Sequence, residues 1–197
     1  IDWPRDRNSI IMVDYEFFDE LVYNPGSIAQ FALGAYDVYL ETGDRAARAE
    51  FLRHAWWLKA KGMDAEGRFP YLWKYSSREL FPPWYSGMAQ GMGISALLRA
   101  YQMTNDASYL AAARQAFRPF TVSVAGGGVT TRDGAELWLE EYTEPNPKQV
   151  LNGAVFAMWG VWDLYRVTGD PIAKNVFDRD TMTLANHLDD YEYRGYC

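Results

Sequence analysis

A short motif that occurs three times restricts the fold of this sequence more than any other feature. The pattern is Tyr-x-x-Thr, then Gly or Asn, then Asp, and its copies span Tyr39–Asp44, Tyr101–Asp106 and Tyr165–Asp170. Gly and Asn adopt the left-handed conformation that ends a helix, and Asp accepts hydrogen bonds from the free N–H groups of the next helix. Each copy therefore predicts a tight turn between the two helices of a hairpin.

The residues before each motif have the spacing of an amphipathic helix. Before the third copy, apolar side chains recur three or four positions apart, at Leu151, Ala154, Val155, Met158, Val161, Trp162 and Tyr165. Each motif is thus expected to follow a first helix and to precede a second helix, over residues 45–61, 107–119 and 171–188. The sequence therefore predicts three helical hairpins.

Long connections separate these hairpins. Residues 62–86 are rich in aromatic residues, Gly and Pro, and residues 120–149 contain two strand-like runs, Val129–Thr131 and Glu136–Trp138, around the turn signal Asp133-Gly134. We therefore predict a mainly α fold, a partial (α/α) toroid built of about three helical hairpins with short β-hairpins in the long loops. In such a fold the first helices line the inside, and the long loops gather at one mouth, where a site is expected.

Composition argues against several classes of partner and site. The net charge is −7, and Lys and Arg form no stripe, so no nucleic acid is expected to bind. No apolar run reaches the roughly 20 residues of a membrane span. His54 and His187 are the two histidines, and neither has a partner at ligand spacing, so we expect no metal site. Cys197 is the single cysteine, which excludes an intrachain disulfide.

Aromatic residues are numerous, with eight Trp, fourteen Tyr and ten Phe. Rings with an apolar face and a polar edge are typical of sugar-binding clefts, and a wide helical core uses the same large side chains. The most chemically varied stretch is Leu139–Pro147, a Pro-broken loop with carboxylates and a phenol that leads into an apolar helix. By itself it is better explained as a solvated acidic loop with one half-buried Tyr.

Two blocks of sequence stand at the entry to predicted first helices. One is Pro83-Trp84-Tyr85-Ser86-Gly87-Met88-Ala89-Gln90-Gly91, and the other runs from Glu140-Glu141-Tyr142 to Val150-Leu151-Asn152-Gly153. Together they resemble the heparan sulfate and heparosan glucuronyl carbon-5 epimerases, in the helical C-terminal domain of that family. The resemblance covers roughly residues 23–197 and leaves residues 1–22 as an N-terminal extension.

The resemblance implies a reaction at carbon 5 of a glucuronic acid residue within a polymer, which gives iduronic acid without a cofactor. The proton lies next to a carboxylate, so its removal produces an enolate-like dianion that needs a positive or hydrogen-bonding partner. Inversion also needs an acid/base group on each face of the ring. The implied partner is an acidic polysaccharide, and the implied location is extracytoplasmic or in the lumen of the secretory pathway.

The family is thought to use tyrosines as acid/base groups, and the tyrosine of its Glu-Glu-Tyr motif corresponds to Tyr142. Glu141 is expected to orient or polarise this phenol, and Asn152 to bind the sugar or its carboxylate. The alternatives are structural: Tyr142 as a half-buried residue at the rim, and Asn152 as a helix cap.

Other residues of the two blocks and loops are expected to contact the substrate. Trp84 and Tyr85 would form part of a sugar-facing wall, with Gln90 one turn further along the helix. Structural alternatives are a core position for Trp84 and an interhelical hydrogen bond for Gln90. The positive side chains near the long loops could make a basic mouth for a polyanion, or be solvated surface charges: Arg68, Lys74, Arg78, Arg132 and Lys148.

The sequence departs from the family at both ends. Further catalytic tyrosines and an arginine of the epimerases lie downstream of the third hairpin, so we expect the toroid domain to be incomplete and the 197-residue chain alone to be inactive. Because only 22 residues precede the matching region, we expect no counterpart of the β-rich N-terminal portion of the animal enzymes. The oligomeric state is left open, with a homodimer among the options.

Two other classes of function remain open at this point. A uronic-acid polysaccharide lyase would use the same proton abstraction, and a glycoside hydrolase would need two carboxylates, for which Glu140, Glu141, Glu144 and Asp133 are available. The other class is a catalytically inactive glycan-binding domain that retains the aromatic mouth.

Overall fold

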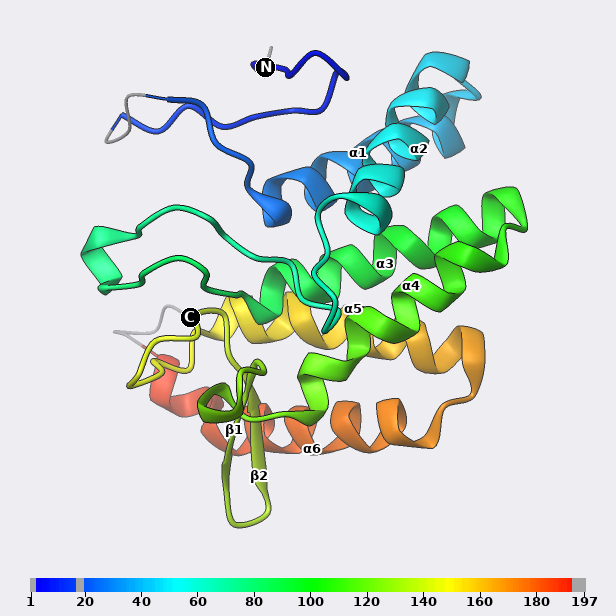
Figure 1. The fold of residues 1–197 in the computed structure, drawn as a ribbon. Helices are drawn as coiled ribbons and strands as arrows, with labels where there is room; N and C mark the ends of the chain where they lie inside the picture. The colour runs from blue at the N-terminus through cyan, green and yellow to red at the C-terminus, as the bar shows by residue number, and fades with distance from the viewer. Residues whose placement is uncertain (1–2, 17–19, 193–197) are drawn as a thin grey trace.

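The computed structural model describes residues 3–16 and 20–192 and contains, within them, three antiparallel helical hairpins (Figure 1). The helices are α1 Pro25–Thr42, α2 Arg45–Ala60, α3 Gly87–Thr104, α4 Ala107–Phe117, α5 Leu151–Thr168 and α6 Pro171–His187. The predicted hairpins are confirmed, and the predicted second helices end within two residues of the observed ones. The mainly α fold is confirmed as well.

The three tight turns lie together at one end of the molecule, on the right of Figure 1. Gly43, Asn105 and Gly169 have positive φ values of 72°, 57° and 69°, and their N–H groups donate to the carbonyl oxygens of the motif tyrosines. In each copy the Asp carboxylate accepts from an N–H of the following helix, as Asp44 does from Ala46 at 2.8 Å. The motif threonine accepts from the backbone N–H of the same Asp. The motif is thus a self-contained turn.

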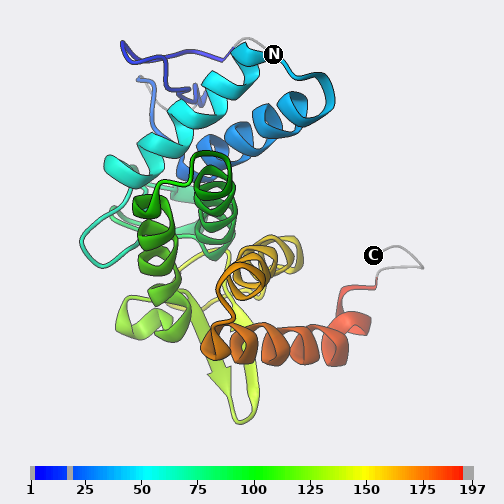
Figure 2. The same ribbon diagram turned by 90° about the vertical axis from the view of Figure 1, so that its right-hand side faces the viewer.

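The first helices of the three hairpins, α1, α3 and α5, lie side by side and form the inner layer of an open arc, with α2, α4 and α6 outside (Figure 2). The backbones of α3 and α5 approach closely, because Gly91 and Gly160 face each other. A Cβ atom on Gly160 would lie 2.1 Å from the carbonyl oxygen of Gly91. This close approach explains why α3 contains Gly91 although glycine weakens a helix.

The long connections lie at the other end of the molecule, on the left of Figure 1. The first, residues 61–86, contains a short 3-10 helix, Ser76–Arg78. The second contains 3-10 helices at Arg118–Thr121 and Val124–Gly126, followed by a β-hairpin of β1 Thr130–Asp133 and β2 Glu136–Leu139. The strands pair in antiparallel register around Gly134, as the sequence predicts.

Residues 3–16 pack against the first hairpin. Ile10 and Ile11 are buried in the main apolar core, and the N–H of Ile11 donates to Nε2 of His54 at 3.2 Å. The N-terminal segment therefore contributes to the same core as the helices. Among the described residues, no helix combines the length and apolar character that crossing a membrane requires.

Candidate active site

The structure brings the two sequence blocks into direct contact. The N–H of Gly87, at the start of α3, donates to the carbonyl oxygen of Glu140 at 2.8 Å. A Cβ atom on Gly87 would lie 2.5 Å from that oxygen, so glycine is required for this approach. The N–H of Tyr85 donates to the Thr143 hydroxyl at 3.1 Å, and this hydroxyl donates back to the carbonyl oxygen of Tyr85 at 3.2 Å. These bonds join the entry of α3 to the loop before α5.

A cavity of about 210 Å³ lies where this junction meets the start of α1 and the N-terminal segment. Aromatic rings and a few polar groups line it: Tyr15, Asn24, Gly26, Ser27, Gln30, Tyr71, Trp73, Tyr75, Trp84, Ser86, Met88, Glu141 and Tyr142. Its volume is below the range of roughly 300–1,000 Å³ that is typical of ligand sites. By its volume the cavity can therefore accommodate about one sugar residue rather than a length of polymer.

Glu141 is the carboxylate of this cavity and is only 5% exposed. Its Oε2 atom has no hydrogen-bond partner within the described part of the chain. Burial raises the pKa of Glu141, and interaction with the Tyr142 hydroxyl and with Arg78 opposes this rise. The side chain lies against the first turn of α5, where a Cβ atom on Gly153 would be 2.3 Å from Cβ of Glu141. Gly153 thus leaves the space that Glu141 occupies.

Tyr142 lies beside Glu141, half-buried at the edge of the cavity. Burial raises the pKa of its phenol, and the neighbouring Glu141 carboxylate raises it further because a second negative charge there is unfavourable. The phenol is therefore protonated at neutral pH. Glu141 and Tyr142 form a coupled acid/base pair in a poorly solvated position.

Arg78, at the end of the first 3-10 helix, covers the outer side of the phenol. Its guanidinium carbon is 3.9 Å from the centre of the Tyr142 ring, and its Nη1 is 3.0 Å from Oε1 of Glu144. The Glu144 side chain is only 9% exposed, so this ion pair is largely buried at its acidic end. The positive charge of Arg78 opposes the rise of the pKa values of Glu141 and Tyr142.

Trp84 forms a wall of the cavity, as the sequence predicts, and it is also part of an aromatic cluster. Its ring stacks on Tyr71 at 3.9 Å and lies 6.0 Å from the Tyr142 ring. Its indole N–H donates to the carbonyl oxygen of Trp73 at 2.8 Å. The ring is 4% exposed, so its packing role accompanies its position at the cavity.

Sequence reasoning missed the tyrosines and the asparagine that complete the cavity. The Tyr71 hydroxyl donates to Oδ1 of Asn24 at 3.1 Å and accepts from the N–H of Gly26, while Asn24 Nδ2 donates to the Tyr15 hydroxyl at 2.7 Å. Burial raises the pKa values of Tyr71 and Tyr15. The high tyrosine content pointed to such a lining, but not to these positions.

The structure corrects the prediction that Gln90 contacts a substrate. Its side chain is 1% exposed and is fully used within the protein. Nε2 donates to the carbonyl oxygens of Gly67 at 2.6 Å and Ala116 at 2.7 Å, and Oε1 accepts from the N–H of Phe69 at 3.1 Å. Gln90 fastens the first long loop to α3 and α4, which is a structural role.

Tyr85 and Arg68 lie away from the cavity of Tyr142. The Arg68 guanidinium stacks on the Tyr85 ring at 4.4 Å and pairs with Asp64 at 2.9 Å and Glu66 at 3.1 Å. Tyr85 lines a different cavity of about 300 Å³, together with Trp84 and Thr143. Neither side chain is part of the lining of the cavity that contains Glu141 and Tyr142.

Asn152 and Lys74 are exposed. Asn152 lies in the first turn of α5, and the N-cap position there belongs to Val150, so Asn152 is not the cap. Lys74 lies on the first long loop and lines an open groove next to the cavity. Their substrate contacts remain predictions.

No group of three or more metal-ligating side chains occurs in residues 3–16 and 20–192. Both histidines have local partners. His54 is buried, with Nδ1 2.8 Å from the Glu50 carbonyl oxygen. His187 contacts Asp190 at 2.8 Å and Glu136 at 3.0 Å.

Comparison with known proteins identifies the family of the two joined blocks. A family model described as D-glucuronyl C5-epimerase C-terminus matches residues 63–197, which contain the first long loop, both blocks and the Glu141–Tyr142 pair. The chain belongs to this epimerase family. The resemblance inferred from the sequence is thereby confirmed.

Individual relatives of this epimerase-family chain agree. A D-glucuronyl C5-epimerase of Caenorhabditis elegans is 32% identical over 154 residues, which are 74% of this chain and 25% of the worm protein. An uncharacterized protein of Methanocaldococcus jannaschii is 27% identical over 129 residues, 61% of this chain and 42% of that protein. The chain thus spans a quarter to two-fifths of these relatives.

A solved structure confirms the toroid. The crystal structure of a family 76 glycoside hydrolase from a bovine Bacteroides thetaiotaomicron strain, an (α/α) toroid, superposes with a TM-score of 0.61. The superposition covers 94% of this chain and 39% of the hydrolase chain at 15% identity, so it concerns the fold alone. The three hairpins of this chain therefore have the fold of an arc of that toroid.

Proposed function

We propose that this chain forms part of a cofactor-independent uronate epimerase that converts D-glucuronic to L-iduronic acid residues in a heparosan- or heparan-like polymer. The observation that carries the proposal is the coupled pair Glu141 and Tyr142 at a buried aromatic cavity, within the segment that matches the epimerase family. Such a polymer would be met outside the cytoplasm or in the lumen of the secretory pathway.

The reaction breaks the carbon 5–hydrogen bond of the uronic acid and leaves the glycosidic bonds intact. The electron pair moves into the adjacent carboxylate to give an enediolate, and a new carbon 5–hydrogen bond then forms on the opposite face. A proton is lost to one acid/base group and regained from another, so no redox partner is required. Because the intermediate is negatively charged, nearby hydrogen-bond donors and cations stabilise it.

Glu141 and Tyr142 would serve one face of the ring. The raised pKa of Tyr142 keeps a proton on the phenol that can be donated to carbon 5, and a protonated Glu141, whose pKa is also raised, can then return a proton to the phenolate. Arg78 stacks on the same ring and limits the build-up of negative charge on the pair. The opposite face needs a second group, and the proposal assigns only one face to this chain.

The arrangement of carboxylates disfavours the hydrolase alternative. Hydrolysis needs two carboxyl groups across the scissile bond, about 5–9.5 Å apart. In the described chain Glu141 is the one carboxylate that lines the cavity. Glu140 accepts from the Thr131 hydroxyl and from the N–H of Gln149, and Glu144 pairs with Arg78. A lyase would share the proton abstraction, so product analysis must separate it.

Incubation of the full-length protein with heparosan in deuterated water tests the proposal. The expected result is deuterium at carbon 5 and new iduronic acid, observed by NMR, with the polymer length unchanged. Unsaturated chain ends would establish a lyase, and new reducing ends a hydrolase. Binding of heparosan without any exchange at carbon 5 would overturn the proposal in favour of an inactive glycan-binding domain.

A further inference from the structure

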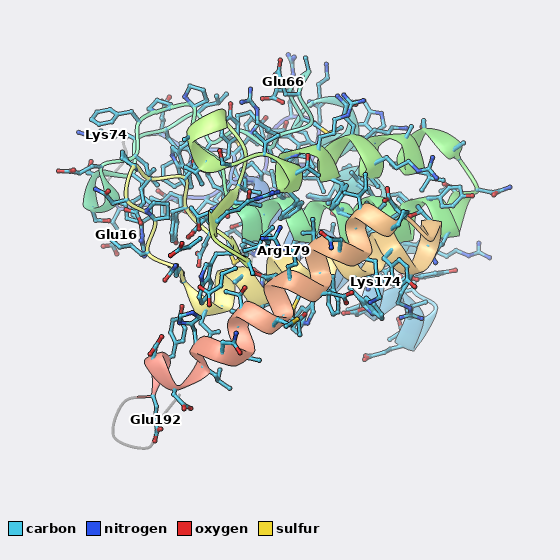
Figure 3. All side chains as sticks on the ribbon, turned by 90° about the horizontal axis from the view of Figure 1, so that it is seen from below. Glu16, Glu66, Lys74, Lys174, Arg179 and Glu192 are labelled. Atoms are coloured by element: carbon cyan, nitrogen blue, oxygen red, sulfur yellow. The ribbon has the colours of Figure 1, made fainter. Side chains whose placement is uncertain are left out.

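A second, open cavity of about 660 Å³ includes Arg78, the residue that stacks on the Tyr142 ring, in its lining. We call it the cationic groove, and the lining residues that matter here are Lys74, Arg78, Glu79, Phe81, Glu144 and Lys148. The groove lies between the first long loop and the loop that follows Tyr142. Figure 3 places Lys74 at the edge of the molecule, on the side where the long loops lie, well away from Lys174 on α6.

Positive charge predominates in the cationic groove, although the chain as a whole is acidic. Lys74 and Lys148 are exposed, and neither makes an ion pair with any residue that the structure describes. Of the two carboxylates in the groove, Glu144 is already paired with Arg78 at 3.0 Å. The two lysine ammonium groups are therefore available to a ligand, opposed by Glu79 alone.

Arg78 lies between the groove and Tyr142, because it lines the groove and contacts the Tyr142 ring. The guanidinium carbon of Arg78 stands 3.9 Å from the centre of the Tyr142 ring, while the same side chain lines the groove. Glu144, Pro145 and Lys148 lie two, three and six positions after Tyr142 in the chain. A polymer that presents one residue to Tyr142 would therefore extend into the groove on this side.

The groove also offers a surface on which a sugar ring can pack. Phe81 is 65% exposed, and the Lys74 ammonium lies 4.9 Å from the centre of its ring. An exposed aromatic face beside a cation suits a sugar that carries a negative charge, because the ring contacts C–H groups and the ammonium contacts the anion. Neutral ligands would gain little from the two lysines.

We propose that the cationic groove is a subsite for an anionic group of the polymer close to the residue held at Tyr142, either a sulfate on the adjacent glucosamine or the carboxylate of the next uronic acid. The inference rests on the proposed function for its choice of polymer. Lys74 and Lys148 bind the anion, Phe81 supports the ring, and Arg78 forms the boundary between the two residues of the polymer. The groove thereby determines the direction in which the polysaccharide passes Glu141 and Tyr142.

The test is a double variant, Lys74→Ala/Lys148→Ala, of the full-length protein. Binding of a heparosan oligosaccharide, followed by calorimetry, should weaken about fivefold at low salt and become less sensitive to salt, since two exposed charge contacts are lost. Under turnover the change should fall mainly on KM rather than on kcat. Lys74→Arg/Lys148→Arg should restore binding.

Arg45→Ala/Arg114→Ala is the matched control, because it removes two exposed positive charges from the outer helices α2 and α4. Equal loss of binding in the two double variants would overturn the proposal, since the effect would then be one of net charge. Unchanged binding in the lysine variant would overturn it as well. Neutral oligosaccharides of the same length should bind all variants alike.

Two ligands distinguish the source of the anion. Heparosan carries carboxylates alone, whereas N-sulfated heparosan carries sulfates in addition. A larger loss with the sulfated ligand assigns the groove to sulfate, and an equal loss assigns it to the uronate carboxylate. Because binding is measured without turnover, a protein that binds through the lysines but exchanges no carbon-5 proton would refute the epimerase proposal and leave the subsite standing.

Discussion

The two ends of the helical hairpins use acidic residues in opposite ways. At the turn end, each repeat places an aspartate in solvent or near it, where its carboxylate caps a helix, as Asp170 does by accepting from the N–H of Ile172 at 2.8 Å. At the loop end, the carboxylates of Glu140, Glu141 and Glu144 are each less than 10% exposed. The turn end satisfies its charges locally, and the loop end buries them.

This difference separates stability from chemistry. A capping carboxylate stabilises a helix because hydrogen bonds and solvent favour its charged form. A buried carboxylate with an unpaired oxygen, such as Glu141, is unfavourable for folding. The same burial raises its pKa, which suits it to proton transfer. Residues at the loop end should therefore affect activity more than stability, and those at the turn end stability alone.

The largest effect is expected for Tyr142→Phe, which removes one hydroxyl from the loop end. Exchange at carbon 5 should fall by about 10²–10⁴-fold, because an acid/base group is lost while the ring keeps its stacking with Arg78. Deuterium incorporation by the full-length protein measures it, and thermal unfolding should be nearly unchanged. Exchange at the wild-type rate would show that Tyr142 is a rim residue.

A pair of glycine substitutions sharpens the comparison within helices. Gly153→Ala places a methyl group 2.3 Å from Cβ of Glu141, so Glu141 must move and both exchange and stability should fall, stability by about 1–3 kcal/mol. Gly34→Ala on α1 meets no atom within 4 Å and should stabilise the protein by roughly 0.5–1 kcal/mol. Urea denaturation and the exchange assay measure the two effects.

The two glycine variants have a clear contrary outcome. If Gly153→Ala retained full exchange, the position of Glu141 against α5 would be unimportant for the reaction. A loss of stability in Gly34→Ala would mean that the inner surface of α1 is covered in the full-length protein.

The structure of the turns could be predicted from the sequence, but the part of the cavity lining formed by Tyr71 and Asn24 could not. The repeated motif contains all the partners of the turn, since the tyrosine carbonyl, the threonine hydroxyl and the aspartate lie within six residues. This part of the lining depends on contacts between residues far apart in the sequence, such as the hydrogen bond between Tyr71 and Asn24, which are 47 positions apart. Long-range contacts of this kind leave no local pattern to read.

The candidate site shows the same division. Glu141 and Tyr142 were found because they form part of a recognisable block, and Trp84 because its block stands at the start of a helix. Gln90 belongs to the same block as Trp84, yet its side chain donates hydrogen bonds to the carbonyl oxygens of Gly67 and Ala116. These two residues are 23 and 26 positions away, and no sequence pattern indicates that they contact Gln90. A residue in such a block is therefore expected near the site, but the block does not show whether its side chain lines the cavity or holds neighbouring segments in place.

The buried carboxylate of Asp180, on the side of α6 that contacts β2, should make the stability of the protein depend on pH. Burial raises its pKa from the ordinary 3.8 to about 8; Leu139 N–H donates to Oδ1, and Oδ2 has no partner among the described residues. Between these values the folded state holds a proton that the unfolded chain has released. The contribution of Asp180 to the free energy of unfolding therefore falls as pH rises from about 4 to about 8.

Asp180→Asn should remove this part of the pH dependence. The variant should gain stability relative to the wild type as pH rises through that window, on the order of 1–3 kcal/mol at its upper end. Urea denaturation at several pH values measures it, with Asp178→Asn on the same helix as the matched control. A difference that stays constant across the window, or that shrinks, would show that Asp180 is ionised in the folded protein.

The smallest effect on exchange at carbon 5 is expected at the turn end, for Asp170→Ala. The substitution removes the acceptor for the N–H groups of Ile172 and Ala173 at the start of α6, and loss of such a cap costs about 0.5–2 kcal/mol. Exchange at carbon 5 should be unaffected below the melting temperature, because the turn lies at the far end of the hairpin (Figure 1). Asp170→Asn retains a capping oxygen and should recover most of the stability. A fall in exchange without a fall in stability would break the separation between the two ends, since it would couple a helix cap to the acid/base pair.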